Sequence, residues 1–334
     1  MLDILKETNS LLSQDIMKNK VAVLWDSEIQ EWGSEKPLGD KACTTYEFFS
    51  KLAQKRNIQL LIANYKEYEN GVVKKSWAWE AGSWERRENE EVNLVFDKFK
   101  LDDETFRLKK RMAEEVGIIN APELDMLCKD KLKSYKEFSD LTPRTMKATR
   151  DNVKEMIDQY GKVVIKPRYA FGGEGVTMLE TIEEYEEDIN PEEYVVQRFV
   201  DSSKGIEDLV EGSHDLRAII SNGEVQIAYV RFNEDDFISN VAEGGNKKKV
   251  DLENFPDEGK ELVEKVKNKI DSEFPLSNYS VDLFFDEESN PWIIELNSKP
   301  GMNFKIKGKV DQELKKDSEK LMKALLDMFA EKID

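Results

Sequence analysis

The sequence predicts an α/β protein with two or three packed lobes, and three observations support this. The continuous apolar run Val21–Trp25 has the composition of a central parallel strand. Segments with strand character alternate with segments of helix character, as they do in α/β domains. The 334 residues suffice for more than one lobe with a sizeable core.

The N-terminal third of the chain is expected to form a small α/β domain. Thr44, with Glu47 three positions later, predicts a capping box at the start of its first helix. Asn70-Gly71, between two short β-prone runs, predicts a tight hairpin turn. After Val21–Trp25, the expected strands are Ile58–Ala63, Asn93–Phe96 and Ile118–Ile119, and the expected helices are Tyr46–Arg56 and Asp103–Val116.

Two further segments of this part have an expected structure and an open role. Residues 1–20 place Leu5, Leu12 and Ile16 near one face of a helix, which favours packing on the body or on a partner subunit over membrane binding. Trp77 and Trp79 share a face if their segment is a strand. An aromatic ligand platform is compatible with this pair, but a hairpin core is favoured.

The rest of the chain has the elements of two further lobes. The central elements are expected as helix Asp130–Phe138, helix Asp151–Tyr160, strand Val163–Lys166, strand Val176–Leu179, an acidic helix Glu183–Asp188 and strand Tyr194–Gln197. The last part is expected to contain helix Lys260–Ile270, strands Val281–Phe285 and Pro291–Asn297, and a terminal helix from Asp311 that packs into a core.

The composition excludes several classes of protein. A formal net charge of −19 argues against a nucleic-acid partner, but not against a small anion such as ATP bound by local cations. Cys43 and Cys128 are too far apart in the sequence for a metal-binding set and are expected as reduced, buried thiols. The single histidine, His214, excludes a mechanism with a histidine pair and is expected to be structural. No signal peptide or membrane-length apolar run is found, which predicts a cytoplasmic protein without a membrane partner.

The stretch Ser280–Asn303 holds the strongest candidate for a functional site. Its two β-prone runs are joined by the turn DEESN, so Asp282 is expected roughly opposite Glu295. Glu295 and Asn297 point to the same face because strand side chains alternate. Two carboxylates and an amide oxygen within apolar strands need compensation, and Mg²⁺ prefers such oxygens together with substrate phosphates. The spacing alone leaves open a hairpin with two solvated acids.

A second candidate site lies upstream, in the segment KPRYAFGGEGV. Gly172, Gly173 and Gly175 can expose backbone N–H groups that cover phosphates. Lys166 ends the preceding strand and can place a point charge on a phosphate. The loop fits neither G-x-x-x-x-G-K-[ST] nor G-x-G-x-x-G, so an ordinary turn between strands remains an alternative.

Together with their neighbours, these motifs resemble the ATP-grasp superfamily. The chain has, in the order of that family, CKDKLKSYKEF with LTPRT, Lys-Pro with GGEGV, the strand YVVQRFV, the D-x-R strand in HDLRAIISNGEVQIAYVRF, and D…E-x-N-x-x-P-G. FISNVAEGG is similar to the S-N…G-G element of the branch that includes glutathione synthetase and the ribosomal-protein glutamate ligases. The resemblance, from about Asn120 to Asn303, implies a pre-ATP-grasp domain over residues 1–128 and two lobes enclosing ATP, a lid lobe over 129–197 and a metal-bearing C-terminal lobe over 198–334.

The reaction implied by this resemblance is the ATP-dependent ligation of a carboxylate to an amine. The carboxylate attacks the γ-phosphate to give an acyl phosphate and ADP, and the amine then displaces phosphate to leave an amide or peptide bond. Such a site works by positioning and by charge neutralisation. An ATP-binding module that ligates nothing and a kinase of the same fold are the alternatives.

The resemblance also implies which residues bind the nucleotide. Lysines contact its phosphates, glycines cover them, the hinge between the lobes meets the adenine, and two further side chains contact the ribose and a phosphate or metal. In that order the residues are Lys131 and Lys166; Gly172, Gly173 and Gly175; Gln197, Arg198 and Phe199; Asp201; and Asn240.

Catalytic and metal-binding roles are implied in the same way. Arg217 resembles the D-x-R arginine that stabilises charge at the acyl phosphate, with an ion pair to Asp215 or a neighbour as the structural alternative. Arg231 is expected to hold a substrate carboxylate, and Lys166 is counted among the catalytic residues. Two Mg²⁺ ions are expected, with Mn²⁺ as a possible replacement, and Glu295 is expected to bridge them. The metal ligands are Asp282, Glu295 and Asn297.

Some positions depart from the family pattern and leave the subfamily open. They are Arg168, Tyr169, Phe171 and Glu174 around the glycine loop, and Lys299 in the metal strand. The expected substrates are small carboxylates and amines, among them amino acids or peptides. Their identity is expected to depend on residues 27–43, 77–84 and 235–250. A homo-oligomer is expected only by analogy with the fold.

Overall fold

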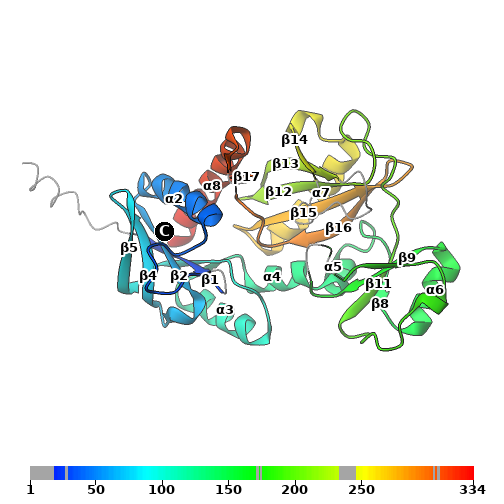
Figure 1. Ribbon diagram of the computed structural model, residues 1–334, viewed down its shortest axis with the longest axis horizontal. Helices are drawn as coiled ribbons and strands as arrows, with labels where there is room; N and C mark the ends of the chain where they lie inside the picture. Colours follow the sequence, from blue (N-terminus) through cyan, green and yellow to red (C-terminus); the bar gives the residue numbers. More distant parts are fainter. Residues whose placement is uncertain are drawn as a thin grey trace, which may run out of the picture. The chain divides into compact units, whose positions relative to one another are not determined.

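The computed structural model describes residues 19–26, 29–170, 173, 175–232, 246–303, 305–306 and 309–334. Gly172, Asn240 and residues 1–18 of the predicted N-terminal helix lie outside these residues. The chain forms two compact units (Figure 1). The first comprises Met1–Ile119 with Gly301–Asp334, and the second comprises Asn120–Pro300.

The first unit is built on a seven-stranded sheet with a parallel centre. Its strand order is β3-β4-β2-β1-β6-β7, with β5 paired to β4. The strands are β1 (Asn19–Trp25), β2 (Ile58–Asn64), β3 (Tyr68–Glu69), β4 (Val72–Glu80), β5 (Ser83–Glu91), β6 (Leu94–Asp97) and β7 (Ile118–Ile119). β1 lies between two parallel partners, and its residues 21–24 are fully buried. The four strands expected in this part are therefore confirmed.

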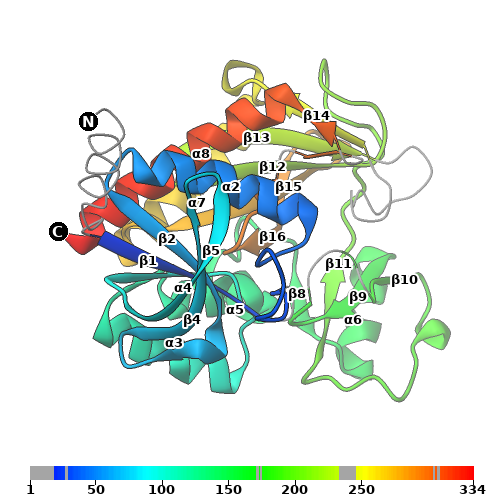
Figure 2. The ribbon, with the colours of Figure 1, turned by 60° about the vertical axis from the view of Figure 1, so that its left-hand side comes forward.

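The helices of this unit are α2 (Asp40–Gln54), α3 (Asp103–Glu115) and α8 (Gln312–Ile333), with the short 3-10 turn η1 (Tyr65–Glu67). α2 and α8 lie side by side, with the rings of Phe49 and Phe329 6.1 Å apart (Figure 2). Most apolar residues of α8 are buried, which confirms that this helix packs into the core. A short two-stranded ribbon, β17 (Lys305–Ile306) and β18 (Lys309–Val310), precedes α8.

The capping box predicted at Thr44 and Glu47 is wrong. α2 begins one turn earlier, after the N-cap residue Gly39, and the Thr44 hydroxyl donates a hydrogen bond to the carbonyl of Asp40 inside the helix. A threonine can bond the carbonyl one turn back as well as cap a helix, so the motif did not fix the boundary.

The hairpin predictions are confirmed. Asn70 and Gly71 both have positive φ, 49° and 80°, as a two-residue hairpin turn requires. The β4–β5 hairpin that follows is longer than the sequence indicated. The sequence did not predict β5 because this strand is rich in charged residues. Trp77 is 3% exposed and its ring contacts that of Trp32, which fits the expected hairpin core.

The second unit contains two antiparallel sheets. A four-stranded sheet has the order β10-β9-β11-β8, and a five-stranded sheet has the order β14-β13-β12-β15-β16. The first consists of β8 (Thr145–Lys147), β9 (Val163–Pro167), β10 (Thr177–Leu179) and β11 (Tyr194–Arg198). The second consists of β12 (His214–Ser221), β13 (Glu224–Phe232), β14 (Asn246–Val250), β15 (Asn278–Phe285) and β16 (Pro291–Asn297).

The helices of the second unit include one that the sequence did not predict and lack one that it did. They are α4 (Pro122–Lys129), α5 (Lys131–Glu137), α6 (Arg150–Tyr160) and α7 (Asp257–Glu273), with the 3-10 turns η2 (Ile182–Glu184) and η4 (Leu252–Asn254). α4 was not predicted. The acidic helix Glu183–Asp188 is wrong, because only η2 forms there, closed by a capping box between Thr181 and Glu184.

The domain boundaries expected at residues 128 and 197 stay a prediction. The structure places α8, which was assigned to the C-terminal lobe, in the first unit through its contacts with α2 and β6. Among the described residues, no helix is long and apolar enough to cross a membrane.

We predict that two glycines in the loop between β11 and β12 differ sharply in their tolerance of alanine. Both have positive φ, +82° at Gly205 and +77° at Gly212, but a Cβ at Gly205 would lie 2.1 Å from the Val210 carbonyl oxygen. A Cβ at Gly212 would meet nothing within 4 Å. Gly212→Ala should therefore cost only about 1–2 kcal/mol of backbone strain.

Gly205→Ala should lower the free energy of unfolding by about 2 kcal/mol more than Gly212→Ala, because the backbone itself must move. Urea unfolding of both variants measures this difference. Equal losses would show that the loop relaxes freely around residue 205.

Candidate functional site

The five-stranded sheet has an apolar face and a face that carries a row of charged side chains, Arg217, Asp282 and Glu295. Leu216, Ala218 and Val281 belong to a buried cluster that also includes residues of α7. On the other face the register pairs Arg217 with Asp282, and Asp282 with Glu295. The predicted position of Asp282 opposite Glu295 is thus confirmed. Because strand side chains alternate, the row of charges faces away from this core.

Two arginines share the Asp282 carboxylate. Arg217 donates through Nε to Oδ1 at 2.6 Å and through Nη2 to Oδ2, and Arg231 donates through Nη2 to Oδ2 at 2.9 Å. Arg231 also makes a two-point contact with Asp215, with Nε 3.0 Å from Oδ1. All four side chains are largely buried. The ion pair considered for Arg217 therefore exists, but its partner is Asp282.

The electrostatics of this group follow from burial and from the arginines. Burial, followed by the neighbouring Asp282 carboxylate, raises the pKa of Asp215 to about 7, although Arg231 and Arg217 act against it. Burial would also raise the pKa of Asp282, but Arg217 and Arg231 together hold it below its usual value. Asp282 is the ionised centre of the group.

Two lysines approach the same row from other elements. Lys131, the first residue of α5, places Nζ 3.6 Å from Oε1 of Glu295. Lys166 on β9 is 6% exposed and donates to Oε1 of Gln197 at 2.7 Å. Burial, with the nearby Lys131 ammonium, lowers the pKa of Lys166 to about 7. Burial raises the pKa of Glu295, and Lys131 opposes this.

The side chain of Gln197 has a role that the sequence did not reveal. Its Nε2 donates to the Thr145 hydroxyl at 2.8 Å, which in turn donates to the carbonyl of Pro143 at 2.8 Å. The carboxamide oxygen is thereby turned toward Lys166. The sequence placed Gln197 only in the hinge, because side-chain partners this distant in the sequence leave no local signal.

The other residues predicted to bind the nucleotide contact aromatic rings or backbone groups near them in the structure. The guanidinium carbon Cζ of Arg198 lies 5.6 Å from the centre of the Tyr160 ring and 5.1 Å from the centre of the Trp292 ring. Lys162 lies over Phe199, and Asp201 accepts a hydrogen bond from the Ser203 N–H at 2.9 Å. Gly173 and Gly175 have positive φ, 81° and 70°, which glycine adopts without strain.

Lys299, for which the sequence predicted no role, supports the end of β16. Its Nζ lies 2.7 Å from Oδ2 of Asp125 on α4, and the Ser298 hydroxyl bonds the other oxygen of that carboxylate. The Lys299 N–H donates to Oδ1 of Asn297 at 2.8 Å. This contact orients the carboxamide of Asn297. The sequence could not show the contact between Lys299 and Asp125, because Asp125 lies in the helix α4, which was not predicted.

The predicted metal ligands fit a divalent cation that also binds phosphate. Three hydrogen bonds to Asp282 leave it one of the about four lone-pair positions of a carboxylate. Glu295 is a largely buried carboxylate with an ammonium at 3.6 Å, and Asn297 keeps a second lone pair on Oδ1. Within the described ranges, no three His, Cys, Asp or Glu side chains form a metal cluster. Such a sparse donor set suits Mg²⁺, which takes one or two carboxylates and completes its shell with water and phosphate.

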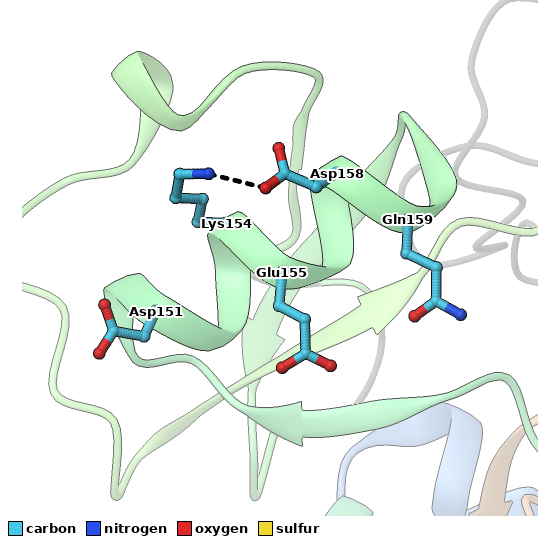
Figure 3. A pocket seen from close by; sticks show the side chains of 5 residues that line it. All are labelled: Asp151, Lys154, Glu155, Asp158 and Gln159. Atoms are coloured by element: carbon cyan, nitrogen blue, oxygen red, sulfur yellow. Dashed lines mark hydrogen bonds and ion pairs between the residues drawn. The ribbon is translucent and has the colours of Figure 1, made fainter.

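His214 and a surface hollow can be set apart from this site. His214 accepts from the Phe285 N–H at Nε2 and has Nδ1 3.1 Å from the Gly212 carbonyl, while burial lowers its pKa. It is a neutral structural histidine, as expected. Figure 3 shows a hollow lined by one helix, α6, where Lys154 pairs with Asp158 at 2.7 Å. Its side chains form solvent-exposed ion pairs, and such pairs contribute little to the stability of a protein.

Comparison with known proteins identifies the family. Residues 125–319, more than half of the chain, match the family model described as the RimK-like ATP-grasp domain. The tetrahydromethanopterin:alpha-L-glutamate ligase of Methanocaldococcus jannaschii is 26% identical over an alignment of 224 residues, and the match covers 62% of this chain and 69% of that protein.

Solved structures share the fold at low sequence identity. D-alanyl-alanine synthetase A from Vibrio cholerae is 14% identical with a TM-score of 0.62, and the match covers 95% of this chain and 100% of that one. An ATP-grasp ligase of Chryseobacterium gregarium, solved with ADP and a leader and core peptide, is 12% identical with a TM-score of 0.59, over 94% and 97% of the two chains.

These findings confirm the expected ATP-grasp fold and the expected class of ATP-dependent carboxylate–amine ligase. The residues that the family model matches include the whole charged row and both lysines. The chain belongs to the RimK-like ATP-grasp family.

Proposed function

We propose that the charged row of the second unit transfers the γ-phosphoryl group of ATP to a substrate carboxylate, and that an amine then displaces the phosphate. The observation that carries this proposal is the balance of charge between the row and the charged side chains that surround it. Lys131, Lys166, Arg217 and Arg231 face the carboxylates of Asp215, Asp282 and Glu295. Such a cationic surplus suits a polyanionic nucleotide, since phosphoryl transfer needs mainly positioning and neutralisation.

In this proposal the two lysines hold the phosphates. Lys131 and Lys166 reach the row from α5 and β9, and their mutual repulsion contributes to the lowered pKa of Lys166. Phosphate oxygens between them would relieve that repulsion. Backbone groups of residues 197–199 would meet the adenine, Asp201 the ribose, and Gly173 and Gly175 the phosphates.

The metal ligands in this proposal are Asp282, Glu295 and Asn297, which would hold two Mg²⁺ ions, with Mn²⁺ as a replacement. When bound, the cation neutralises phosphate charge and orients the γ-phosphoryl group. The chain itself supplies the oriented carboxamide of Asn297 and the largely buried carboxylate of Glu295.

The arginines would act on the acyl group. Arg217 lies beside Asp282 in the row and would stabilise charge at the acyl phosphate. Arg231, one strand further along, would hold the substrate carboxylate. Each now bonds a carboxylate of the row, so a bound substrate anion would compete for the same N–H groups.

The substrates are proposed to be amino acids or peptides. The Methanocaldococcus jannaschii relative is named as a glutamate ligase, so L-glutamate is the first amine to test. A homo-oligomer in the cytoplasm, acting without nucleic acid, completes the proposal. The net charge of −19 supports the last point.

Release of phosphate from Mg-ATP, screened over pools of amino acids and peptides, tests this function. A ligase should release ADP and phosphate only when both a carboxylate and an amine are present. A phosphorylated product without free phosphate would identify a kinase. Tight ATP binding with no turnover in any pool would favour a binding module.

We predict that Glu295→Gln lowers the rate of phosphate release by at least about two to three orders of magnitude, as expected when a donor to the transferring group is lost. Isothermal titration with Mg²⁺ and ADP should also show weaker metal-dependent binding. Glu287→Gln, an exposed glutamate in the turn before β16, is the matched control and should behave as wild type. A fully active Glu295→Gln enzyme would contradict the assignment.

We also predict that ATP binding takes up a proton at Lys166. In the free protein its pKa is about 7, so near pH 8 most of this side chain is neutral. Phosphate favours the ammonium form and raises its pKa, so ATP affinity should fall as pH rises from 6 to 8.

Calorimetry in buffers of different ionisation enthalpy measures the uptake, which should approach one proton at pH 8 and vanish near pH 6. The comparison with Lys166→Met cancels the ionisation of ATP itself. Identical proton uptake in both proteins at pH 8 would show that Lys166 is not the titrating group.

A further inference from the structure

The segment Arg168–Ala170 makes four contacts with the start of helix α5. Arg168 donates through Nε to Oδ1 of Asp130 at 2.7 Å and through Nη2 to Oδ2 at 2.6 Å. The N–H of Lys131 donates to the Arg168 carbonyl at 3.3 Å, and Nζ of Lys131 donates to the Ala170 carbonyl. The segment after β9 thus contacts Lys131 both at its backbone N–H and at its side-chain ammonium.

Asp130 is the centre of these contacts. It is 1% exposed and caps α5 by accepting from the N–H groups of Leu132, at 3.0 Å, and Lys133, at 3.5 Å. A carboxylate this buried needs a counter-charge, and the planar fork of Arg168 supplies it at two points. The backbone of the next residue, Lys131, therefore depends on the Arg168–Asp130 pair.

Lys131 has a demanding position. Its ammonium is largely buried and stands 3.6 Å from Glu295 on β16, a strand of the other sheet. A lysine side chain has a flexible four-carbon stem, so the stem alone does not fix the ammonium. The carbonyl of Ala170 and the anchored backbone restrict it to this place.

We propose that Arg168 is a positioning residue for Lys131: through Asp130 it fixes the start of α5 and thereby the ammonium that meets the nucleotide phosphates. The inference rests on the proposed contact of Lys131 with ATP. The contacts of Arg168 with Asp130 and Lys131, and of Lys131 with Ala170, form a clamp on the start of α5. Loss of the clamp is expected to act on ATP affinity through Lys131.

A double-mutant cycle tests this with the affinity for Mg-ATP, measured by calorimetry on the full chain. Lys131→Met and Arg168→Met are each expected to weaken binding by about fivefold or more, the size of coupling found within one network. In the Lys131→Met background, Arg168→Met should change the affinity by less than about twofold. Arg168→Lys, which keeps the charge but not the fork, should lose affinity too and guards against a misfolded Arg168→Met.

The matched control is Arg150→Met on α6, an exposed arginine paired with Glu187, which should leave the affinity unchanged. If the effects of Arg168→Met and Lys131→Met multiply, Arg168 acts independently of Lys131 and the inference is overturned. If Lys131→Met weakens binding and neither Arg168 variant does, the inference fails while the proposed role of Lys131 stands. If Lys131→Met has no effect, the phosphate role fails first and the inference falls with it.

Discussion

The neutralisation of buried charge on one face of the five-stranded sheet is the interaction on which the second unit depends. Asp282 is 2% exposed in a strand whose opposite face is apolar core, and it remains ionised because Arg217 and Arg231 both bond it. Removing one partner of such a group leaves an uncompensated buried charge, which costs about 3–5 kcal/mol. The same charges that stabilise the sheet are the ones proposed to act on the phosphates, so stability and function are coupled at this site.

The junction of helices α4 and α5 ties the two sheets of this unit together. Asp125 on α4 bonds Lys299 beyond the end of β16, and Asp130 bonds Arg168 beyond the end of β9. Lys131 lies between them and reaches Glu295. Each pair joins a buried acid to a cation, so each depends on geometry that holds both partners in place. This explains why Arg168 and Lys299 are central to the architecture of this unit.

Much of the fold was predictable, because its signals are local. The apolar run of β1, the turn at Asn70-Gly71 and the hairpin that pairs Asp282 with Glu295 each depend on a few adjacent residues. The errors also have a local origin. The threonine at position 44 bonds inside the helix instead of capping it, and the acidic residues after Thr181 form only one 3-10 turn. The charged residues of β5 do not show the alternating pattern of a strand. This strand forms because β4 pairs with it.

By itself, the sequence determined the family, since a family pattern is a property of the order of residue types. It also determined that Asp282, Glu295 and Asn297 lie on one face of the sheet, because side chains alternate along β15 and β16. Only the tertiary structure decided the partners: Arg217 with Asp282, Gln197 with Lys166, Arg168 with Asp130. Those pairs join residues 31–65 positions apart. Burial selects such pairs, because each charge must meet whichever opposite charge or dipole the packed lobes bring within reach.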